Sequence, residues 1–170
     1  MTTASRRNGW LRLDDEALLK QCREERYRSS GPGGQRRNKV ETAARLHHEP
    51  SGLSAHSADT RYLQRNRLRA LRRLRERIAL AVRAPFDLET TKLPKEFIAQ
   101  RGPDGTLAVN ERNIVYPIVA ATALDALEAA GGSYAQAARA LGITTSQLVK
   151  FLRADAAIRR TLESPRIETA

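Results

Sequence analysis

The sequence predicts an α+β protein in which a small mixed domain precedes an all-helical module. Three observations lead to this fold class: two short strand-like runs joined by turn residues, a long amphipathic helix rich in arginine, and a C-terminal succession of apolar helical segments. They divide the 170 residues into a first domain over residues 1–84, a linker over residues 85–112 with room for a small hairpin, and a helical module over residues 113–164.

The N-terminal part of the first domain is expected to contain one helix. Residues 1–12 show no helical pattern and are expected to be disordered. Asp14 can cap a helix that we predict to run from Asp15 to Arg26, with acidic residues in its first turn. Cys22 follows Leu18 at helical spacing, so we interpret it as a small buried hydrophobic residue without a catalytic role.

Two strands and a long helix complete the first domain. Residues 45–49 and 53–57 are predicted strands, and Pro50-Ser51-Gly52 between them predicts the turn of a hairpin. Asp59 is expected to cap a helix that runs to Arg83. Its predicted apolar stripe consists of Leu68, Leu71, Leu74, Ile78 and Val82. The other face holds seven arginines and one glutamate between positions 65 and 77. Like charges at this spacing repel, which favours a helix that meets an anion.

The second half of the chain begins with breaks in periodicity and continues as helices. Residues 97–100 and 106–109 flank the sequence RGPDG and could pair as a small hairpin. Residues 113–130 predict an apolar helix, interrupted near its start by Pro117 and stopped by Gly131-Gly132.

The segment SYAQAARALGITTSQLVKFLRAD resembles the helix-turn-helix of bacterial regulators. With Gly142 as the turn glycine, small or apolar residues occupy the positions that the motif requires: Ala137, Ala138, Leu141, Ile143, Leu148 and Phe151. Only Lys150 and Arg153 are available there for phosphate contacts. A helical hairpin used for packing or for docking another protein explains the same pattern.

Charge is concentrated in the first half. The chain has 30 basic and 19 acidic residues, and residues 1–84 hold 20 of the basic and 9 of the acidic ones. Residues 85–170 hold ten of each, so the whole formal net charge of +11 lies in the first half. Arginine makes up 25 of the 30 basic residues and suits phosphate binding. A polyanionic partner is therefore expected, nucleic acid before an anionic membrane, although a merely solubilising surface would also be basic.

The sequence gives little support for a secreted or membrane-spanning protein or for a bound cofactor. No run of about 18 apolar residues and no apolar signal core is present, and the single cysteine cannot form an intrachain disulfide, so a soluble, cytoplasmic protein is expected. No metal or cofactor is expected, because the histidines lack a further ligand at metal-binding spacing. We interpret these histidines as surface or RNA-facing residues: His47, His48 and His56.

The most unusual stretch is RSSGPGGQRRNK, residues 28–39. It lacks the spacing of a phosphate-binding P-loop and of a dinucleotide fingerprint. Its glycines permit backbone angles closed to other residues and a close approach to a ligand. Gln35 cannot act as a general base, but its amide and its backbone N–H suit positioning a water and stabilising an oxyanion.

Residues 28–52 resemble the GGQ domain of class I peptide chain release factors. The shared features are Ser30 to Gln35 (SGPGGQ), Asn38-Lys39, the strand from Ala44 to His48 and the Pro50-Ser51-Gly52 turn, followed by QRNR at Gln64 to Arg67; the resemblance extends over residues 13–83. It implies a GGQ domain built from a helix, the GGQ loop, short antiparallel strands and a long basic helix, joined here to a helix-turn-helix-like module.

The resemblance implies hydrolysis of the peptidyl-tRNA ester in the peptidyl transferase centre of the large ribosomal subunit. The helix leading into the loop is similar to that of mitochondrial rescue factors, so a monomeric, codon-independent hydrolase of stalled ribosomes is expected, with ribosomal RNA and peptidyl-tRNA as partners and no membrane. The implied catalytic residues are Gly33, Gly34 and Gln35. The implied RNA-binding residues are Arg28, Arg36, Arg37, Asn38, Lys39, Arg65, Arg67, Arg69, Arg72 and Arg73.

Two departures from the family pattern stand out. Arg36-Arg37 replaces the usual small pair after the glutamine, and the C-terminal RRTLESPRIETA is less basic than the tail of several rescue factors. Two alternatives remain: a non-enzymatic ribosome- or RNA-binding factor, and a DNA-binding regulator that uses the helix-turn-helix.

Overall fold

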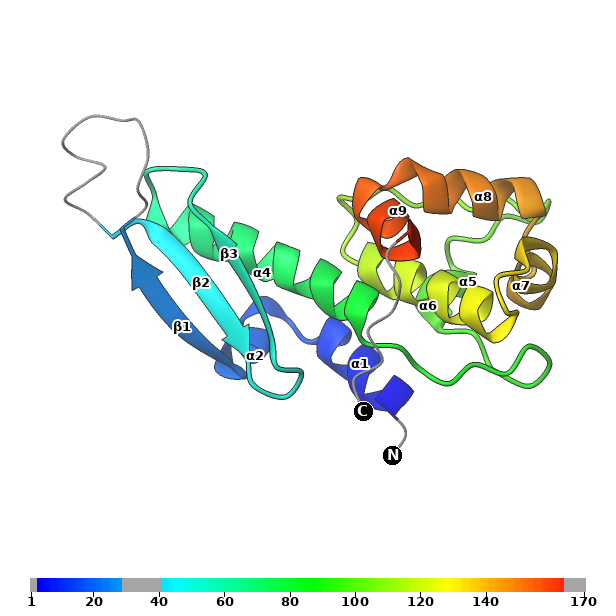
Figure 1. Cartoon of the computed structure of the whole chain (residues 1–170), viewed down its shortest axis with the longest axis horizontal. Coiled ribbons are helices and arrows are strands. Elements are labelled where there is room, and N and C mark those ends of the chain that lie inside the picture. Colours follow the sequence, from blue (N-terminus) through cyan, green and yellow to red (C-terminus); the bar gives the residue numbers. More distant parts are fainter. Residues whose placement is uncertain (1–2, 29–40, 164–170) are drawn as a thin grey trace. The chain divides into compact units, whose positions relative to one another are not determined.

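The computed structural model describes residues 3–28 and 41–163, with side chains from Arg6 onward. The chain forms two compact units, one made of Asn8–Val82 and the other of Met1–Arg7 together with Arg83–Ala170. The first unit combines helices with a three-stranded sheet and the second is helical (Figure 1). The predicted α+β fold class with a C-terminal helical module is confirmed.

The sheet of the first unit is antiparallel, with strand order β1 (Cys22–Tyr27), β2 (Ala43–His48) and β3 (Leu53–Ser57). The predicted hairpin is confirmed: β2 and β3 pair from Ala44↔Ser57 to His48↔Leu53. Gly52 ends the turn with φ of 68° and donates its N–H to the carbonyl of His48. A positive φ is open to glycine at little cost, so this residue fixes the turn.

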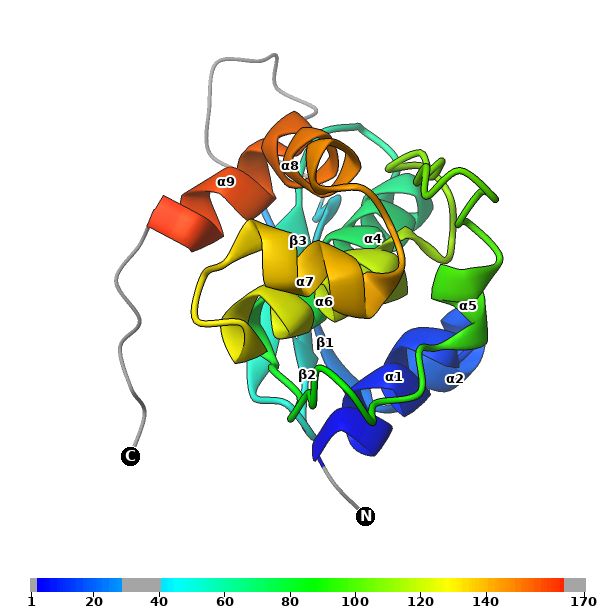
Figure 2. The same ribbon diagram turned by 90° about the vertical axis from the view of Figure 1, so that its right-hand side faces the viewer.

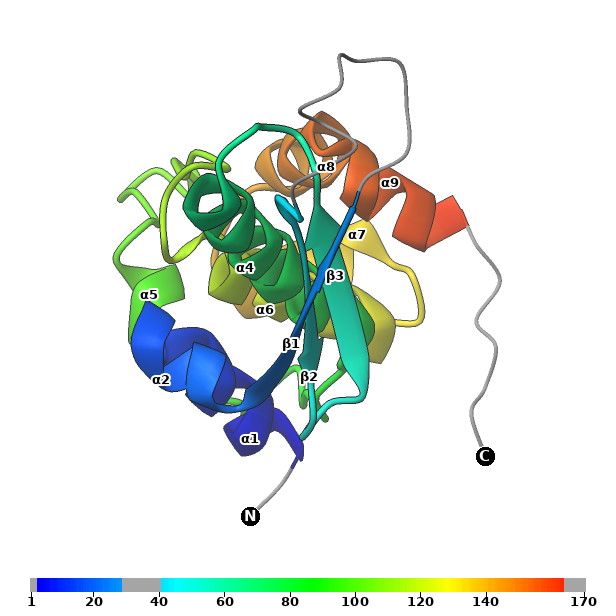
Figure 3. The same ribbon diagram turned by 90° about the vertical axis from the view of Figure 1, so that its left-hand side faces the viewer.

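Helix α4 (Leu63–Ala81) lies across one face of the sheet (Figure 3). Alternation along β2 places Leu46 against the helix, and Leu71, Leu74 and Ile78 of α4 complete an aliphatic core with exposures of 1% or less. Leu68 was predicted in this stripe and is 54% exposed, because Asn66, Ala70 and the residues one turn further on occupy the buried face.

The start of α4 differs from the prediction. Asp59 does not cap the helix: α4 begins after Tyr62, whose side chain makes no cap hydrogen bond. The Asp59 carboxylate instead accepts hydrogen bonds from Arg69 and Arg73, about two and three turns into the helix. Two guanidinium groups are stronger partners for a carboxylate than backbone N–H groups, which explains the altered role.

The helix predicted over residues 15–26 ends early. Asp14 caps α2 (Asp15–Lys20) as expected, by accepting the Ala17 N–H at 2.7 Å. The chain then continues as β1, which pairs with β2 along its whole length, from Cys22↔His48 to Tyr27↔Ala43. The prediction was wrong after Lys20, because strand pairing with residues 16 to 26 positions later overrides a local helical pattern.

The expected disorder of residues 1–12 was also wrong, because Thr3–Arg12 forms helix α1. Long-range contacts hold its second half. The Trp10 ring packs edge-on against the His48 ring at 5.1 Å, and Leu11 is 3% exposed. The buried Arg75 of α4 donates hydrogen bonds to the carbonyls of Leu11 and Leu13. None of these contacts can be read from the first twelve residues alone.

The helical unit is built around α6 (Tyr116–Ala129), which is buried from Tyr116 to Leu127. Pro117 lies in its first turn, where its missing N–H needs no partner, so it stands at the beginning of the helix. The predicted interruption of the helix at Pro117 was wrong. Gly131 and Gly132 end the helix with φ of 58° and 86°, as predicted. The carboxylate of Asp125, on α6, pairs with the buried Arg7 guanidinium at 2.6 Å.

The predicted helix-turn-helix geometry is present in this unit (Figure 2). Helix α7 (Tyr134–Leu141) ends at Gly142 with φ of 64°, and α8 (Thr145–Ala154) follows. All six positions predicted to be apolar are buried. Ser133 and Thr144 cap the two helices, and Asp155 accepts the N–H of Ala157 in the first turn of α9 (Ala156–Glu163), which the sequence pattern did not predict.

The segment before α6 also packs in the helical unit. Lys95–Ile98 forms the short helix α5 where a strand was expected, and its Phe97 is fully buried. A single antiparallel bridge, Arg101↔Leu107, closes the turn predicted at RGPDG. The Thr144 N–H donates to the carbonyl of Gly105 in that turn. In the described part of the chain, no helix is both long and apolar enough to cross a membrane.

Candidate functional site

The glycine-rich segment connects two paired strands. β1 ends at Tyr27, β2 begins at Ala43, and these two residues are partners in the ladder. Directly opposite residues of an antiparallel pair have Cα atoms about 4.5 to 5.5 Å apart, so the two ends of the connection are held side by side. The predicted residues Gly33, Gly34, Gln35, Arg36, Arg37, Asn38 and Lys39 lie outside the described residues.

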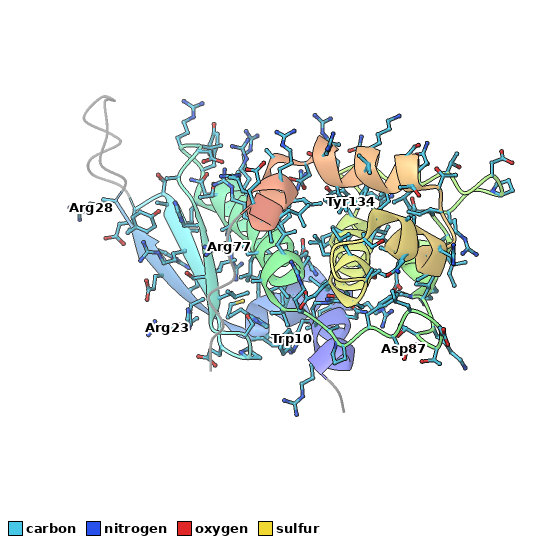
Figure 4. All side chains as sticks on the ribbon, turned by 45° about the vertical axis from the view of Figure 1, so that its right-hand side comes forward. Trp10, Arg23, Arg28, Arg77, Asp87 and Tyr134 are labelled. Carbon is cyan, nitrogen blue, oxygen red and sulfur yellow. The ribbon has the colours of Figure 1, made fainter. Side chains whose placement is uncertain are left out.

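Charged residues stand at both ends of this connection. Arg28 follows β1 and is exposed, with its Nε 3.8 Å from a carboxylate oxygen of Glu41 just before β2. Arg28 lies at one end of β1 and Arg23 near the other (Figure 4). An exposed pair at this distance is worth little, so the Arg28 guanidinium can exchange Glu41 for a phosphate.

Asn66 of α4 is the polar centre beneath the connection. Its side chain is fully buried, and its Nδ2 donates to the carbonyls of Thr42 and Thr60, at 2.7 Å each. Its Oδ1 accepts from the Thr60 N–H at 2.9 Å and from the Thr60 and Ser57 hydroxyls. One side chain thus ties the start of β2, the end of β3 and the turn before α4 together.

Asn66 lies within the QRNR segment, Gln64 to Arg67, but no role was predicted for it from the sequence. A signal was available in the helix pattern. Asn66 falls on the buried face of an amphipathic helix, and a buried amide there must find hydrogen-bond partners. Thr42 is the first residue after the glycine-rich connection to be held in this way, so Asn66 positions the base of that connection.

Most of the predicted arginines of α4 have acidic partners. The Nε of Arg67 lies 2.9 Å from a Glu24 carboxylate oxygen, and Arg72 pairs with Glu76 at 3.2 Å. Arg69 and Arg73 share Asp59 at 3.3 and 2.8 Å. These arginines are between one-third and about half exposed, so their pairs are screened by water and open to competition from phosphate.

The pKa of Asp59, the carboxylate that Arg69 and Arg73 share, reflects the charge of these arginines. Burial raises the pKa of Asp59, but the charge and hydrogen bonds of Arg73, with hydrogen bonds from Ser57 and Arg69, hold the net pKa below its usual value. Arg73 also donates to the carbonyl of His56, and Arg77 donates to the carbonyl of Ser54. These two arginines therefore satisfy carbonyl groups of the outer strand β3, besides any role in binding.

Arg65 is placed differently from its neighbours. Its guanidinium lies over the ring of Tyr62, 4.8 Å from the ring centroid, and Arg61 lies over the same ring at 5.0 Å. Both arginines are exposed. Of these two arginines, only Arg65 was predicted to bind RNA. The sequence shows Tyr62 between Arg61 and Arg65, but it does not show that the tyrosine ring lies outside the core.

Within the described residues, His48 and Cys22 make structural contacts. His48 was interpreted as a surface residue, but it is fully buried, with Nδ1 2.7 Å from the Ser51 hydroxyl and Nε2 3.1 Å from Oε1 of Gln21. It lies on the face of β2 that packs against α4, the same face as Leu46. Among the described residues, no group of three His, Cys, Asp or Glu side chains could hold a metal ion.

Cys22 lies on β1, half-buried, and not on a helix as predicted. Burial and the nearby Glu49 charge raise the pKa of its thiol to about 11, against a smaller lowering by Arg75. The S–H group is 3.2 Å from the carbonyl of Leu18 and donates to it. A thiol with so high a pKa is a poor nucleophile near neutral pH, which fits the structural interpretation.

A three-stranded antiparallel sheet covered by one basic helix, with a glycine-rich connection between its first two strands, defines the class of protein. The family model described as "RF-1 domain" matches residues 16–103, more than half of the chain. The chain therefore belongs to the RF-1 domain family, that of the GGQ-containing peptide chain release factors, as the resemblance in the sequence implied.

Curated relatives agree with this assignment. The chain is 39% identical over 88 residues to the mitochondrial translation release factor in rescue of Danio rerio, covering 52% of this chain and 55% of the relative. It is 48% identical over 59 residues to peptide chain release factor 1 of Lacticaseibacillus casei, covering 35% of this chain and 16% of the relative. The chain thus spans about half the length of the rescue factor and less than a quarter of the length of release factor 1 relatives.

The helical unit has a separate similarity. A family model described as "Bacterial regulatory protein, Fis family" matches residues 124–153, which include α7, Gly142 and nearly all of α8. No solved structure matches the chain.

Proposed function

We propose that this protein hydrolyses the ester bond of peptidyl-tRNA on stalled ribosomes without reading a codon. The observation that carries the proposal is the intact Gly33-Gly34-Gln35 sequence, which lies inside the segment matched by the RF-1 domain family and between two paired strands. The similarity to a mitochondrial rescue factor supports rescue, and the release factor relatives support the reaction.

In the proposed reaction, water attacks the carbonyl carbon of the ester, the bond to the tRNA ribose oxygen breaks, and a free peptide acid and a free ribose hydroxyl result. The backbone N–H of Gln35 stabilises the charge that develops on the carbonyl oxygen, and its side-chain amide orients the water. Gly33 and Gly34 allow the backbone to present that N–H. The rest of the active site is RNA of the peptidyl transferase centre.

The basic residues bind ribosomal RNA in this proposal. Arg36, Arg37, Asn38 and Lys39 flank the catalytic glutamine in sequence. The described residues Arg28, Arg65, Arg67, Arg69, Arg72 and Arg73 extend the binding surface along the base of the connection and along α4. Where an arginine has an acidic partner, phosphate replaces an exposed ion pair of small net value, so affinity should depend steeply on salt.

The proposed organisation assigns catalysis to residues 1–84 and a separate role to the helical module of residues 113–164, joined by residues 85–112. The module selects the stalled complex. The protein works in the cytoplasm as a monomer and needs no cofactor.

The test is peptide release from ribosomes stalled on truncated mRNA with labelled peptidyl-tRNA. Wild type should release the peptide, and Gly34→Ala should release it about 100-fold more slowly or worse, because a side chain there misplaces the stabilising N–H. Ribosome binding by the variant should persist. Release by neither protein, with binding by both, would make the chain a non-enzymatic ribosome-binding factor.

A second candidate function, DNA binding, has support from the helical unit alone. The match to a bacterial regulatory family and the turn at Gly142 favour it, whereas Lys150 and Arg153 are the only cations on α8. A gel shift that compares duplex DNA with ribosomal subunits separates the two functions: tighter binding of DNA would favour the regulator.

A further inference from the structure

A small cluster at the start of α4 combines an exposed aromatic ring with two cations. Tyr62 is 45% exposed, although it directly precedes the helix. The guanidinium carbons of Arg61 and Arg65 lie 5.0 and 4.8 Å from the centroid of its ring. Both separations fall within the range of a cation–π interaction, so the ring restrains two otherwise flexible guanidinium groups.

Tyr62 is an unfavourable residue for the position that it occupies. It holds the N-cap position of α4 and makes no side-chain cap hydrogen bond. Serine, threonine, aspartate or asparagine would provide that bond and stabilise the helix. Its ring is not part of the core either, because almost half of the side chain is exposed. A local rule broken without a compensating gain in packing points to a role in binding.

The two cations of the cluster also differ from the arginines further along α4. Among the residues that the structure describes, no carboxylate lies within ion-pair distance of Arg61 or Arg65. By contrast, Arg67 pairs with Glu24 of β1, and Arg69 and Arg73 pair with Asp59 in the turn before α4. Within the described part of the chain, the charge of the cluster is therefore available for an external anion.

We propose that Arg61, Tyr62 and Arg65 form a clamp for RNA phosphate groups. The proposal rests on the proposed function for its partner, ribosomal RNA. Guanidinium groups bind phosphate through paired N–H donors, and a preordered pair loses less side-chain entropy on binding. RNA is favoured over an acidic peptide because the excess charge of the whole chain lies in residues 1–84, as arginine more than lysine.

The clamp is connected to the catalytic connection through Asn66. Asn66 directly follows Arg65 in α4. It donates hydrogen bonds to the carbonyl of Thr42, just after the connection, and to the carbonyl of Thr60, just before the cluster. Phosphates bound by the clamp would therefore lie at a fixed position relative to the base of the glycine-rich connection. The clamp fixes where that connection enters the RNA, and it takes no part in the chemistry.

The experiment measures binding of the full chain to purified large ribosomal subunits over a range of salt concentrations. The double variant Arg61→Gln/Arg65→Gln should bind about tenfold more weakly or worse at low salt. The slope of log K against log salt should fall by about 1.5, since each lost phosphate contact contributes about 0.7 to 0.9. The matched control is Arg23→Gln/Arg26→Gln, which removes the same charge from two exposed arginines of β1 that have acidic partners. The control should keep the wild-type slope.

Tyr62→Ser separates binding from stability. Serine supplies the missing cap, so the variant should melt at a higher temperature than wild type, yet it should bind the subunits more weakly because the guanidinium groups lose their support. Tyr62→Phe keeps the ring and should bind like wild type. A purely structural role for Tyr62 would move stability and binding in the same direction and would overturn the proposal.

Peptide release by the same proteins distinguishes the two proposals. Release by wild type with equal subunit binding by both double variants would overturn the clamp and leave the hydrolase intact. Binding that depends on the cluster, without release, would support the clamp and overturn the hydrolase. Failure of wild type to bind large subunits would overturn both.

Discussion

The two compact units are stabilised in different ways. In the unit Asn8–Val82, buried polar side chains join distant segments: Asn66 binds Thr42 and Thr60, and Arg75 binds the carbonyls of Leu11 and Leu13. In the helical unit, α6 is buried over nearly all of its length, α7 and α8 begin at side-chain caps, and one buried ion pair joins Arg7 to Asp125. The Asn66 tie holds the base of an irregular connection, whereas the helix-turn-helix of α7 and α8 is held by packing, side-chain caps and Gly142.

The units also differ in charge. All of the formal excess of +11 lies in residues 1–84, and residues 85–170 are balanced. The polar ties of Asn66 and Arg75 lie in the same unit as the arginines of α4 and the glycine-rich connection. This difference in charge is expected if the first unit binds RNA and the second recognises a partner by other means. Each of the following changes tests one of the two units or the difference between them.

The largest effect on stability should come from Asn66→Ala. The change leaves the Thr42 and Thr60 carbonyls and the Thr60 N–H without their partner, which should cost about 3 kcal/mol of the free energy of unfolding. The matched change in the helical unit is Thr122→Val, which removes a buried hydroxyl bonded only to the carbonyl of Ile118, four residues earlier in the same helix. It should cost less than about 1 kcal/mol. Equal losses in urea denaturation would contradict the distinction between the units.

The second effect compares two arginines of α4. Arg75 is 5% exposed and binds two backbone carbonyls and Asp15, so Arg75→Met should cost about 2 kcal/mol. Arg73 is about half exposed, and Arg73→Met should cost less than about 1 kcal/mol. Subunit binding should respond in the opposite order, with Arg73→Met the more affected once both variants are measured well below their melting temperatures. Equal stability of the two variants would contradict this account of the buried arginine.

The smallest effect is a pH dependence from His48. Burial lowers the pKa of this imidazole below its usual 6.5, and the nearby His47 charge lowers it further. The unfolded chain therefore takes up the proton at a higher pH than the folded chain does. The contribution to stability is complete above pH 6.5 and is lost as the pH falls from 6.5 towards the folded pKa.

Melting temperatures between pH 8 and pH 5 test this sign. Wild type should lose stability below about pH 6.5, and His48→Gln should show a flatter profile. His56→Gln, at an exposed histidine on β3, should behave like wild type. A profile for His48→Gln that parallels wild type would assign the loss to other groups.

The elements that sequence reasoning predicted well are those with local signals. The turn Pro50-Ser51-Gly52 and the left-handed residue Gly142 each fix the geometry of the segments beside them, and both the hairpin and the helix-turn-helix are present. Asp14 capped its helix as predicted, because its partner is only three residues away. Local signals of this kind act before any tertiary contact forms.

The elements that it missed depend on distant partners. Helix α1 requires the contact of Trp10 with His48, and β1 requires its ladder with β2. The family and its glycine-glycine-glutamine motif could be recognised from the sequence, and the family assignment is confirmed. The roles of the motif and of the predicted RNA-binding arginines stay predictions. The ion pairs of those arginines, and the burial of Asn66, depend on where β1, β3 and α4 meet, which no local pattern contains.

The measurement that tests the central claim most directly is codon dependence of peptide release. Ribosomes carrying the same labelled peptidyl-tRNA would be prepared with a truncated message, with a sense codon and with a stop codon in the decoding site. We predict release from the truncated complex and no advantage of the stop codon over the sense codon, with Gly34→Ala inactive throughout. Release that requires the stop codon, or release that survives Gly34→Ala, would contradict the account.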